Sequence, residues 1–196
     1  MRTTIDLLRH GELVGGLRYR GSIEAELTDT GRLQMEAVWA QIKGEVQHIV
    51  SSPLSRCHLV ASEWAVRDGV DCKIIDDFRE MYYGDWEGLS AEEIEQCYPG
   101  QLARWRSNPV GMQIPAAESI ENFAARVIQA WDALLCDYAG QHVLLVAHSG
   151  TLRVILAHVL GADLPATRRF SMPYAAWSRV RHIDGGCFLS HHNRPS

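Results

Sequence analysis

The sequence predicts a three-layer α/β/α fold with a mainly parallel central sheet and an antiparallel strand near the C-terminus. Four apolar segments are predicted to be buried strands, at 4–8, 46–50, 72–75 and 142–147. The run VLLVA in the last of them is typical of a parallel strand that is covered on both faces. Helical segments follow three of these strands, and this alternation indicates an α/β protein.

The helices are predicted from their apolar spacing and from the residues at their ends. The segment 27–44 opens with threonine and aspartate as cap candidates, and 53–69 opens with a proline suited to a first turn. The segment 118–140 keeps a three-four apolar spacing throughout, which indicates the longest amphipathic helix. The segment 151–161 follows the last parallel strand and, like the other three, closes with a glycine.

Two segments depart from the alternation of strand and helix. The tail 175–193 predicts two strands joined around the turn signal DGG. Residues 81–117 are rich in glycine, proline and aromatic residues and predict two short helical pieces at most. We expect a single domain, 1–196, in which 81–117 is an insertion over one end of the sheet and a candidate substrate lid.

Composition restricts the functional classes. The net charge of −5 argues against general nucleic-acid binding, and no apolar run is long enough for a membrane span. The cysteines are odd in number and scattered without a C-x-x-C pair, which favours reduced structural thiols. With no signal-peptide pattern at the amino terminus, a cytoplasmic protein is expected.

Polar side chains follow the carboxyl ends of all four predicted parallel strands. They are Arg9, His10, Arg56, Glu80 and His148. Because those ends share one edge of an open α/β sheet, where ligands bind, we expect these side chains to converge on one crevice. Other carboxylates, at 76, 77, 85 and 87, lie near Glu80 in the sequence as alternatives to it.

This set of side chains suits phosphoryl transfer. Arg9 and Arg56 offer bidentate donors to a tetrahedral oxyanion, and Ser149 opens a helix whose amide groups add further donors. A neutral imidazole is a competent nucleophile, and Glu80 is placed to protonate a leaving oxygen and then activate water. Since these cations neutralise charge, the chemistry requires no metal or other cofactor.

Five segments of the chain resemble the histidine phosphatase superfamily, in its phosphoglycerate mutase-like branch. They are LLRHGE, LTDTGRLQ, SSPLSRC, REMYYGDWEG and VAHSGTLRVIL, in the order typical of the family. The resemblance implies a metal-independent phosphatase in which His10 is the phosphorylated nucleophile and Glu80 the proton donor. Arg9, Arg56 and His148 would then hold the transferring phosphoryl group.

Within the family, RHGELVGGLRYRG and MYYGDWEG most resemble alpha-ribazole phosphatases, which act in cobalamin assembly. The common family pattern places threonine and asparagine where this chain has Leu13 and Gly16. The asparagine contact to substrate is therefore missing. We expect Arg18 or Arg20 to replace it and favour Arg20, because Arg20 precedes Gly21, where the family backbone usually approaches the phosphate.

Several alternatives stay open at this point. A phosphoglycerate mutase or sugar-phosphate phosphatase is the nearest one, although the modest length of the chain and the altered Leu13–Gly16 stretch favour hydrolysis over mutase activity. A non-catalytic phospho-ligand-binding domain would not need a nucleophile or a proton donor, and a metallohydrolase lacks its usual motifs. The expected partner is a small-molecule phosphate ester, and the oligomeric state is open, with a homodimer as one alternative.

Overall fold

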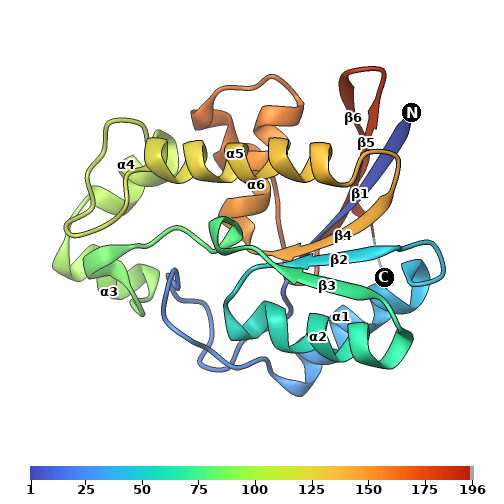
Figure 1. Cartoon of the computed structure of the whole chain (residues 1–196). Coiled ribbons are helices and arrows are strands. Elements are labelled where there is room, and N and C mark those ends of the chain that lie inside the picture. The colour runs from blue at the N-terminus through green and yellow to red at the C-terminus, as the bar shows by residue number, and fades with distance from the viewer. Residues whose placement is uncertain (195–196) are drawn as a thin grey trace.

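The computed structural model describes residues 1–194, and its centre is a six-stranded mixed sheet (Figure 1). The strand order is β3-β2-β4-β1-β5-β6. These strands are β1 (Arg2–Arg9), β2 (His48–Ser51), β3 (Asp71–Ile74), β4 (His142–Ala147), β5 (Trp177–Ile183) and β6 (Gly186–Arg194). The first four are parallel, whereas β5 is antiparallel to β1 and β6 to β5. The predicted fold class is thereby confirmed.

Helices cover both faces of the sheet, as Figure 1 shows. One face carries α1 (Asp29–Ile42) and α2 (Ser55–Asp68), and the other carries α5 (Ile120–Asp137) and α6 (Ser149–Val159). Shorter elements complete the chain, namely η1 (Asp76–Phe78), η2 (Gly84–Trp86), α3 (Ala91–Cys97), α4 (Gln101–Ser107) and η3 (Leu164–Arg169). Among residues 1–194, no helix combines the length and apolar character that a membrane crossing requires.

Some predicted bounds differ from the observed ones by a few residues. Helix α2 begins at Ser55 because Leu54 is extended, with ψ 137°, so Pro53 precedes the helix instead of opening it. Strand β2 begins at His48 because Val46 still belongs to the turn after α1, where its backbone N–H donates a hydrogen bond to the Ile42 carbonyl oxygen. Helix α6 begins at Ser149, the residue expected to open it, although the apolar pattern alone starts at Thr151, so the turn after β4 is very short.

A separate apolar layer fills each side of the sheet. On one side Trp39 of α1 stacks on Trp64 of α2, with ring centroids 5.1 Å apart and both side chains fully buried. On the other side Phe123, Val127 and Trp131 of α5 pack in a larger cluster. Burying a large apolar side chain stabilises a fold by roughly 1.5–3 kcal/mol, so both layers hold the sheet rigidly under its loops.

The segment 81–117 packs onto the carboxyl ends of the parallel strands through aromatic side chains. Trp86 and Trp105 are fully buried and lie edge to face, 6.2 Å between ring centroids. These two tryptophans are therefore packing residues, and neither lines the cavity that contains His10. Helix α3 starts at a capping box formed by Ser90 and Glu93, which satisfies amide groups at its first turn.

Candidate active site

His10 follows the last residue of β1 and lies at the carboxyl edge of the sheet. The next residue, Gly11, touches the backbone of Gly31 in the first turn of α1, where an added Cβ would lie 2.0 Å from a carbonyl oxygen. A glycine is required at this contact. The tight turn directs the His10 ring into the site, where its Nδ1 lies 2.9 Å from the Gly11 carbonyl oxygen.

The environment of His10 keeps its imidazole neutral. Burial lowers the pKa of His10 well below its ordinary value, and the positive charges of Arg9 and Arg56 lower it further. The Gly11 carbonyl oxygen can only accept, so Nδ1 carries the ring hydrogen and donates it. Nε2 then keeps its lone pair, which is the form that a nucleophilic histidine needs.

Arg9 is held beside His10 by the loop that precedes β5. Its Nη1 donates to the Met172 carbonyl oxygen at 2.5 Å, and its guanidinium lies 4.2 Å from the ring centroid of Tyr174. Its Nε is buried and has no hydrogen-bond partner among residues 1–194. A buried donor of this kind is costly to leave unpaired, so the site is suited to receive an acceptor.

Arg56 and His148 form a buried pair behind His10. Arg56 Nε donates to His148 Nδ1 at 3.2 Å, and the His148 ring centroid is 5.4 Å from that of His10. Because Nδ1 accepts, Nε2 carries the hydrogen and donates it to Ser52 Oγ at 2.6 Å. Burial, followed by the charge of Arg56, lowers the pKa of His148 well below its ordinary value.

The remaining donors of Arg56 hold the backbone of residues 11–28, the connection between β1 and α1, which we call the first loop. Its Nη atoms donate to carbonyl oxygens of Ile23 at 2.9 Å, Gly21 at 2.8 Å and Arg20 at 3.3 Å. A guanidinium has five N–H donors, so these bonds and the one to His148 leave little free capacity. Arg56 is buried, and its position fixes the loop around His10. It does not form an ion pair with Glu63, which binds Arg32 instead.

Glu80 lines the same cavity as His10, with its carboxylate fixed by two backbone amides. Oε1 accepts from Met81 N at 3.0 Å and Oε2 accepts from Gly150 N at 2.9 Å. Gly150 belongs to the first turn of α6, and any Cβ there would lie 2.3 Å from Oε1. Ser149, the first residue of α6, lines the same cavity. The backbone of Met81, after η1, and the first turn of α6 thus hold the Glu80 carboxylate together.

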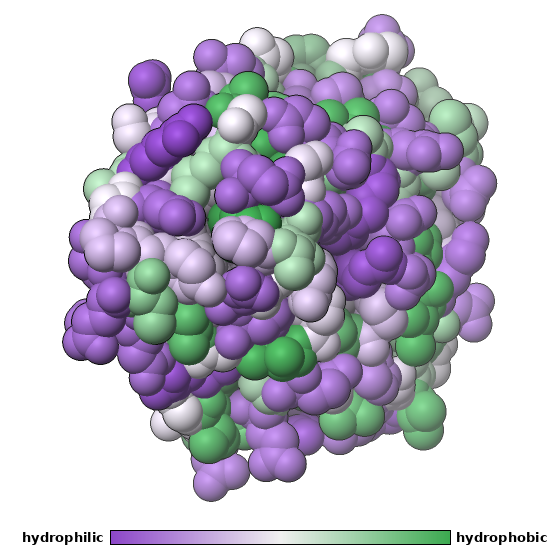
Figure 2. All heavy atoms as spheres, turned by 90° about the vertical axis from the view of Figure 1, so that its left-hand side faces the viewer, coloured by the Kyte–Doolittle hydropathy of each residue, from purple (hydrophilic) through white to green (hydrophobic). Residues whose placement is uncertain are grey.

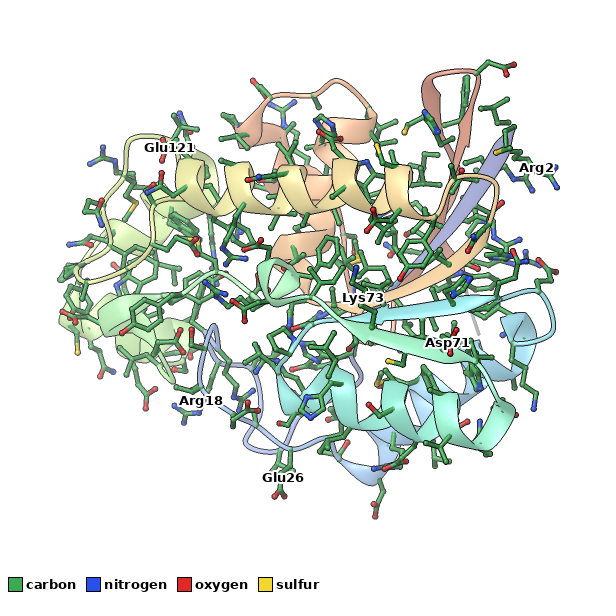
Figure 3. The ribbon with its side chains drawn as sticks, viewed as in Figure 1. Arg2, Arg18, Glu26, Asp71, Lys73 and Glu121 are labelled. Atoms are coloured by element: carbon green, nitrogen blue, oxygen red, sulfur yellow. The ribbon has the colours of Figure 1, made fainter. Side chains whose placement is uncertain are left out.

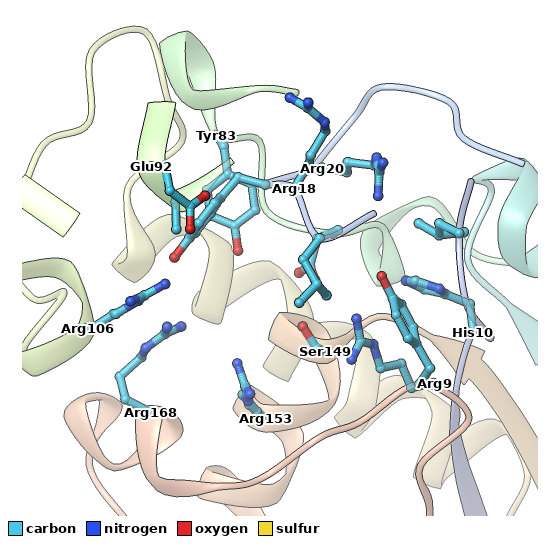
Figure 4. A pocket seen from close by; sticks show the side chains of 16 residues that line it. Arg9, His10, Arg18, Arg20, Tyr83, Glu92, Arg106, Ser149, Arg153 and Arg168 are labelled. Carbon is cyan, nitrogen blue, oxygen red and sulfur yellow. The ribbon is translucent and has the colours of Figure 1, made fainter. Parts of the chain in front are cut away.

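The cavity has a volume of about 500 Å³ and opens at the carboxyl edge of the sheet (Figure 4). Six arginines line it, namely Arg9, Arg18, Arg20, Arg106, Arg153 and Arg168. The other lining residues are His10, Glu80, Glu92, Ser149, Leu13, Leu17, Ala91, Tyr19, Tyr83 and Tyr174. In a protein of net charge −5 this is a local concentration of positive charge. Figure 2 views the molecule from this side, where hydrophilic residues predominate.

Of the side chains expected at the site, Arg9, His10, Arg20, Glu80 and Ser149 line the cavity. Arg56 and His148 are not among the residues that line the cavity. They contact each other, and the His148 ring lies next to that of His10. Arg20 donates to the carbonyl oxygens of Val14 and Gly16, both at 2.8 Å, and its charge is one of those that lower the pKa of His10. Its guanidinium therefore stabilises the first loop from within the cavity.

Glu87 attaches the first loop to the 81–117 segment. Its carboxylate accepts from the amides of Gly21, Ser22 and Tyr83 at 3.0–3.1 Å. At the outer edge of the loop, Arg18 donates to the Gly88 carbonyl oxygen at 2.7 Å and pairs with Glu93. Figure 3 shows Arg18 at this end of the molecule and Arg2 at the opposite end. The loop and the insertion therefore close the cavity together.

Sequence reasoning missed Tyr174 and the arginines at the far end of the cavity. The ring of Tyr174 lies 5.8 Å from that of His10. It reaches the site because β5 is antiparallel to β1, so the segment before Trp177 lies at the carboxyl end of β1. The antiparallel strand predicted near the C-terminus could therefore have pointed to the residues that precede it. Arg153 lies one helical turn after Ser149, which also placed it near the edge.

No cluster of three or more histidine, cysteine or carboxylate side chains suited to a metal ion occurs within residues 1–194. The side chains that line the cavity are mainly guanidinium groups, which donate hydrogen bonds and do not ligate cations. The site is thus built to bind an anion.

An α/β sheet that presents a neutral imidazole, a carboxylate and several guanidiniums at its carboxyl edge defines a phosphatase-type enzyme. The chain belongs to the histidine phosphatase superfamily (branch 1), whose family model matches residues 5–195. It is a phosphatase of that superfamily.

Three relatives illustrate the range of substrates in this family. Phosphoserine phosphatase 1 of Hydrogenobacter thermophilus is 29% identical over 183 residues, which cover 91% of this chain and 85% of the relative. The mycobacterial glucosyl-3-phosphoglycerate phosphatase, solved in complex with inorganic phosphate, is 26% identical with a TM-score of 0.85, covering 98% and 97% of the two chains. The alpha-ribazole phosphatase from Shigella flexneri is 25% identical with a TM-score of 0.86, covering 99% and 96%.

Proposed function

We propose that this phosphatase hydrolyses phosphate monoesters without a metal, through a phosphohistidine intermediate on His10. The observation that carries the proposal is the pairing of His10 and Glu80 in one cavity. The Nδ1 of His10 is bound to the Gly11 carbonyl, which leaves Nε2 for attack, and the Glu80 carboxylate is fixed by two amides within the same cavity.

In the first step Nε2 of His10 attacks phosphorus and the bond from phosphorus to the ester oxygen breaks. Glu80 gives its proton to the departing oxygen, so the alcohol leaves neutral. The low pKa of His10 supports this role, because an imidazole that stays unprotonated is available to attack.

In the second step water attacks phosphorus and the bond from phosphorus to Nε2 breaks. Glu80, now a carboxylate, takes a proton from the water, which restores its acid form for the next cycle. Phosphoryl transfer depends mainly on positioning and on charge neutralisation. Arg9, with its unpaired buried Nε, supplies a donor beside His10.

We assign Arg56 and His148 to the same phosphoryl group, with Ser149 contributing from the start of α6. His148 reaches a phosphoryl oxygen by exchanging its hydrogen bond to Ser52 Oγ for one to the substrate, and Arg56 acts through its charge and its remaining N–H. The 5.4 Å separation of the His10 and His148 rings supports this exchange, since an oxygen on the phosphorus at His10 lies within that interval.

At the level of substrate, alpha-ribazole phosphate is the first compound to test, which would place the enzyme in cobalamin assembly. The first loop resembles alpha-ribazole phosphatases, and Tyr19, Tyr83 and Tyr174 give the cavity aromatic surface for a nucleoside leaving group. The second candidate is a sugar phosphate or phosphoglycerate, acted on by a phosphatase or a mutase. The arginines of the cavity favour it, because they bind a leaving group that is itself anionic.

A phosphate-release panel tests this function. It contains alpha-ribazole phosphate, 3-phosphoglycerate, sugar phosphates and p-nitrophenyl phosphate, assayed with wild type and His10→Ala, with and without EDTA. We expect release by the wild type, no effect of EDTA, and loss of release in His10→Ala. Absence of release from every compound would support a non-catalytic phospho-ligand-binding domain, and loss of turnover in EDTA would contradict the mechanism.

Three further expectations belong to the proposal. We propose a single domain in which 81–117 serves as the cover of the active site, supported by its hydrogen bonds to the first loop through Glu87. A cytoplasmic location and a small-molecule partner, with no role in nucleic-acid or membrane binding, are consistent with the net charge of −5. A homodimer stays a prediction.

A further inference from the structure

The far end of the cavity contains a second group of arginines, remote from His10. Figure 4 shows Arg106 and Arg168 at one end, Arg9 and His10 at the other, and Arg153 between them. Arg106 comes from α4 and Arg168 from η3, whereas Arg153 comes from α6. Three elements that are separate in the sequence therefore direct guanidinium groups into one part of the cavity.

No salt bridge holds these guanidinium groups among residues 1–194, although Arg106 lies near enough to Glu92 for its charge to lower the pKa of that carboxyl group. Within the same residues, Nε of Arg168 is buried without any hydrogen-bond partner. Arg153 donates its Nε to the Phe170 carbonyl oxygen at 2.9 Å, which fixes the side chain without giving it a salt bridge. The nearby Glu80 raises the pKa of Arg153 and so offsets part of the opposing effect of Arg168. Glu92 also lines this part of the cavity, and its carboxylate accepts from Ser90 Oγ at 2.8 Å.

The packing of like charges in this cavity is unfavourable. Burial lowers the pKa of Arg153, and the neighbouring charge of Arg168 lowers it further. Burial likewise lowers the pKa of Arg9, and the charge of Arg153 contributes in the same direction. A continuous row of positive charge thus runs from the nucleophile to Arg168. A bound anion relieves this repulsion, and arginine forks hold carboxylate or phosphate groups in a fixed geometry.

One phosphoryl group cannot use both ends of the row. A phosphoryl group at His10 engages Arg9, so Arg106 and Arg168 are left for another part of the same substrate. The cavity of about 500 Å³ accommodates a small organic molecule with groups at both ends.

We propose that Arg106, Arg153 and Arg168 form a subsite for a second anionic group, phosphate or carboxylate, on the leaving group of the substrate. This inference rests on the proposed function, and it names the substrate class as phosphate monoesters that carry a further anion. It therefore ranks such compounds above alpha-ribazole phosphate, which has a single phosphoryl group and no other anion.

Matched substrate pairs test the subsite. 3-Phosphoglycerate and glycerol 3-phosphate differ in a carboxylate, and fructose 1,6-bisphosphate and fructose 6-phosphate differ in a second phosphate. We expect kcat/KM of the wild type to favour the doubly anionic member of at least one pair by about 10-fold or more, since each hydrogen bond between charged groups is strong. The pair with the larger ratio identifies the anion.

Variants connect the ratio to the arginines. In Arg106→Gln and in the double variant Arg106→Gln/Arg168→Gln, we expect the ratio to fall towards one. Arg106 is exposed, so its replacement leaves the core intact, and Arg104→Gln on the same helix is the matched control that keeps the wild-type ratio. Arg104 does not line the cavity.

The outcomes separate this inference from the proposed function. If wild type releases no phosphate from p-nitrophenyl phosphate or any panel compound, the proposed function fails. If release is normal but both pairs give ratios near one, if the double variant keeps the wild-type ratio, or if alpha-ribazole phosphate exceeds every doubly anionic compound, only the second subsite is overturned.

Discussion

The Glu80 carboxylate accepts a hydrogen bond from the backbone amide of Gly150 at 2.9 Å, and this contact joins the segment between η1 and η2 to the start of α6. The contact leaves no room for a side chain at position 150, since a Cβ would lie 2.3 Å from Oε1 of Glu80. The proton donor of the proposed reaction is therefore positioned by the residue that comes two after His148. A substitution at Gly150 that displaces the Glu80 carboxylate tests whether the position of this carboxylate matters for catalysis.

Gly150→Ala is expected to reduce kcat by about 100-fold, because a shift of the carboxylate by about 1 Å misplaces the proton donor. The helix itself favours alanine, so the variant stays folded. Steady-state hydrolysis of an alkyl phosphate such as glycerol 3-phosphate measures the effect, because its poor leaving group needs a proton to depart. Gly44→Ala is the control, since nothing lies within 4 Å of a Cβ there. Unchanged kcat in Gly150→Ala would mean that Glu80 is not the proton donor.

Arg20→Ala is expected to raise KM by roughly 10-fold or more, if Arg20 supplies the hydrogen bonds that the missing asparagine of the family would make. The side chain lines the cavity and also holds the first loop through Val14 and Gly16. Arg2→Ala, at the opposite end of the sheet, is the control (Figure 3). Kinetics of Arg20→Ala that match the wild type would remove Arg20 from the site.

Stability is expected to fall as the pH drops below about 6.5, the ordinary pKa of histidine. The pKa values of His10 and His148 are lowered in the folded protein, so below pH 6.5 these two side chains bind protons in the unfolded chain but stay unprotonated in the folded one. The loss of unfolding free energy approaches about 1.4 kcal/mol per pH unit for each group, between that pH and its folded pKa. Above this window the contribution is fully present.

Thermal unfolding between pH 8 and pH 5 measures this dependence. His10→Gln removes one of the two groups, so its unfolding temperature should fall less steeply with acidity than that of the wild type. The exposed His158 of α6 provides the control His158→Gln, which should keep the wild-type slope. Equal slopes in all three proteins would show that His10 is not buried in its neutral form.

Much of the fold was predictable because buried parallel strands carry a strong apolar signal. β4 has the predicted bounds, and β1 extends the predicted segment at both ends, since each lies in the middle of the sheet with both faces covered. Helix starts were less predictable. Pro53 suits a first turn, but the extended Leu54 postpones α2 to Ser55.

The site was predictable where a residue follows a parallel strand. Arg9 and His10 follow β1 directly, so strand prediction alone places them at the ligand edge. The sequence carried no comparable signal for Arg168, which reaches the cavity from η3, or for Arg106 in α4. Their positions depend on how the insertion and the segment after α6 pack, and such long-range packing has no short sequence pattern. The hydrogen bonds from Arg56 to the carbonyl oxygens of Gly21 and Ile23 could not be predicted from the sequence for the same reason.

His148 requires its own test, because both of its ring nitrogens are bonded in the free site. Ser52→Ala removes the acceptor of Nε2 while leaving Arg56 on Nδ1. If Nε2 moves to a phosphoryl oxygen during catalysis, this variant keeps kcat within about 10-fold of the wild type, whereas His148→Ala loses about 100-fold or more. Equal large losses in both variants would indicate that the Ser52 bond has to persist throughout the reaction.

The most direct test of the account is to trap the phosphoenzyme. Wild type is mixed with p-nitrophenyl phosphate, quenched rapidly in alkali, and digested for mass spectrometry, while the burst of p-nitrophenol is followed in parallel. We expect one acid-labile phosphoryl group on the peptide that contains His10, formed as fast as the burst, and absent in His10→Asn. Turnover by the wild type without phosphorylation of His10, or a phosphoenzyme that persists in His10→Asn, would contradict it.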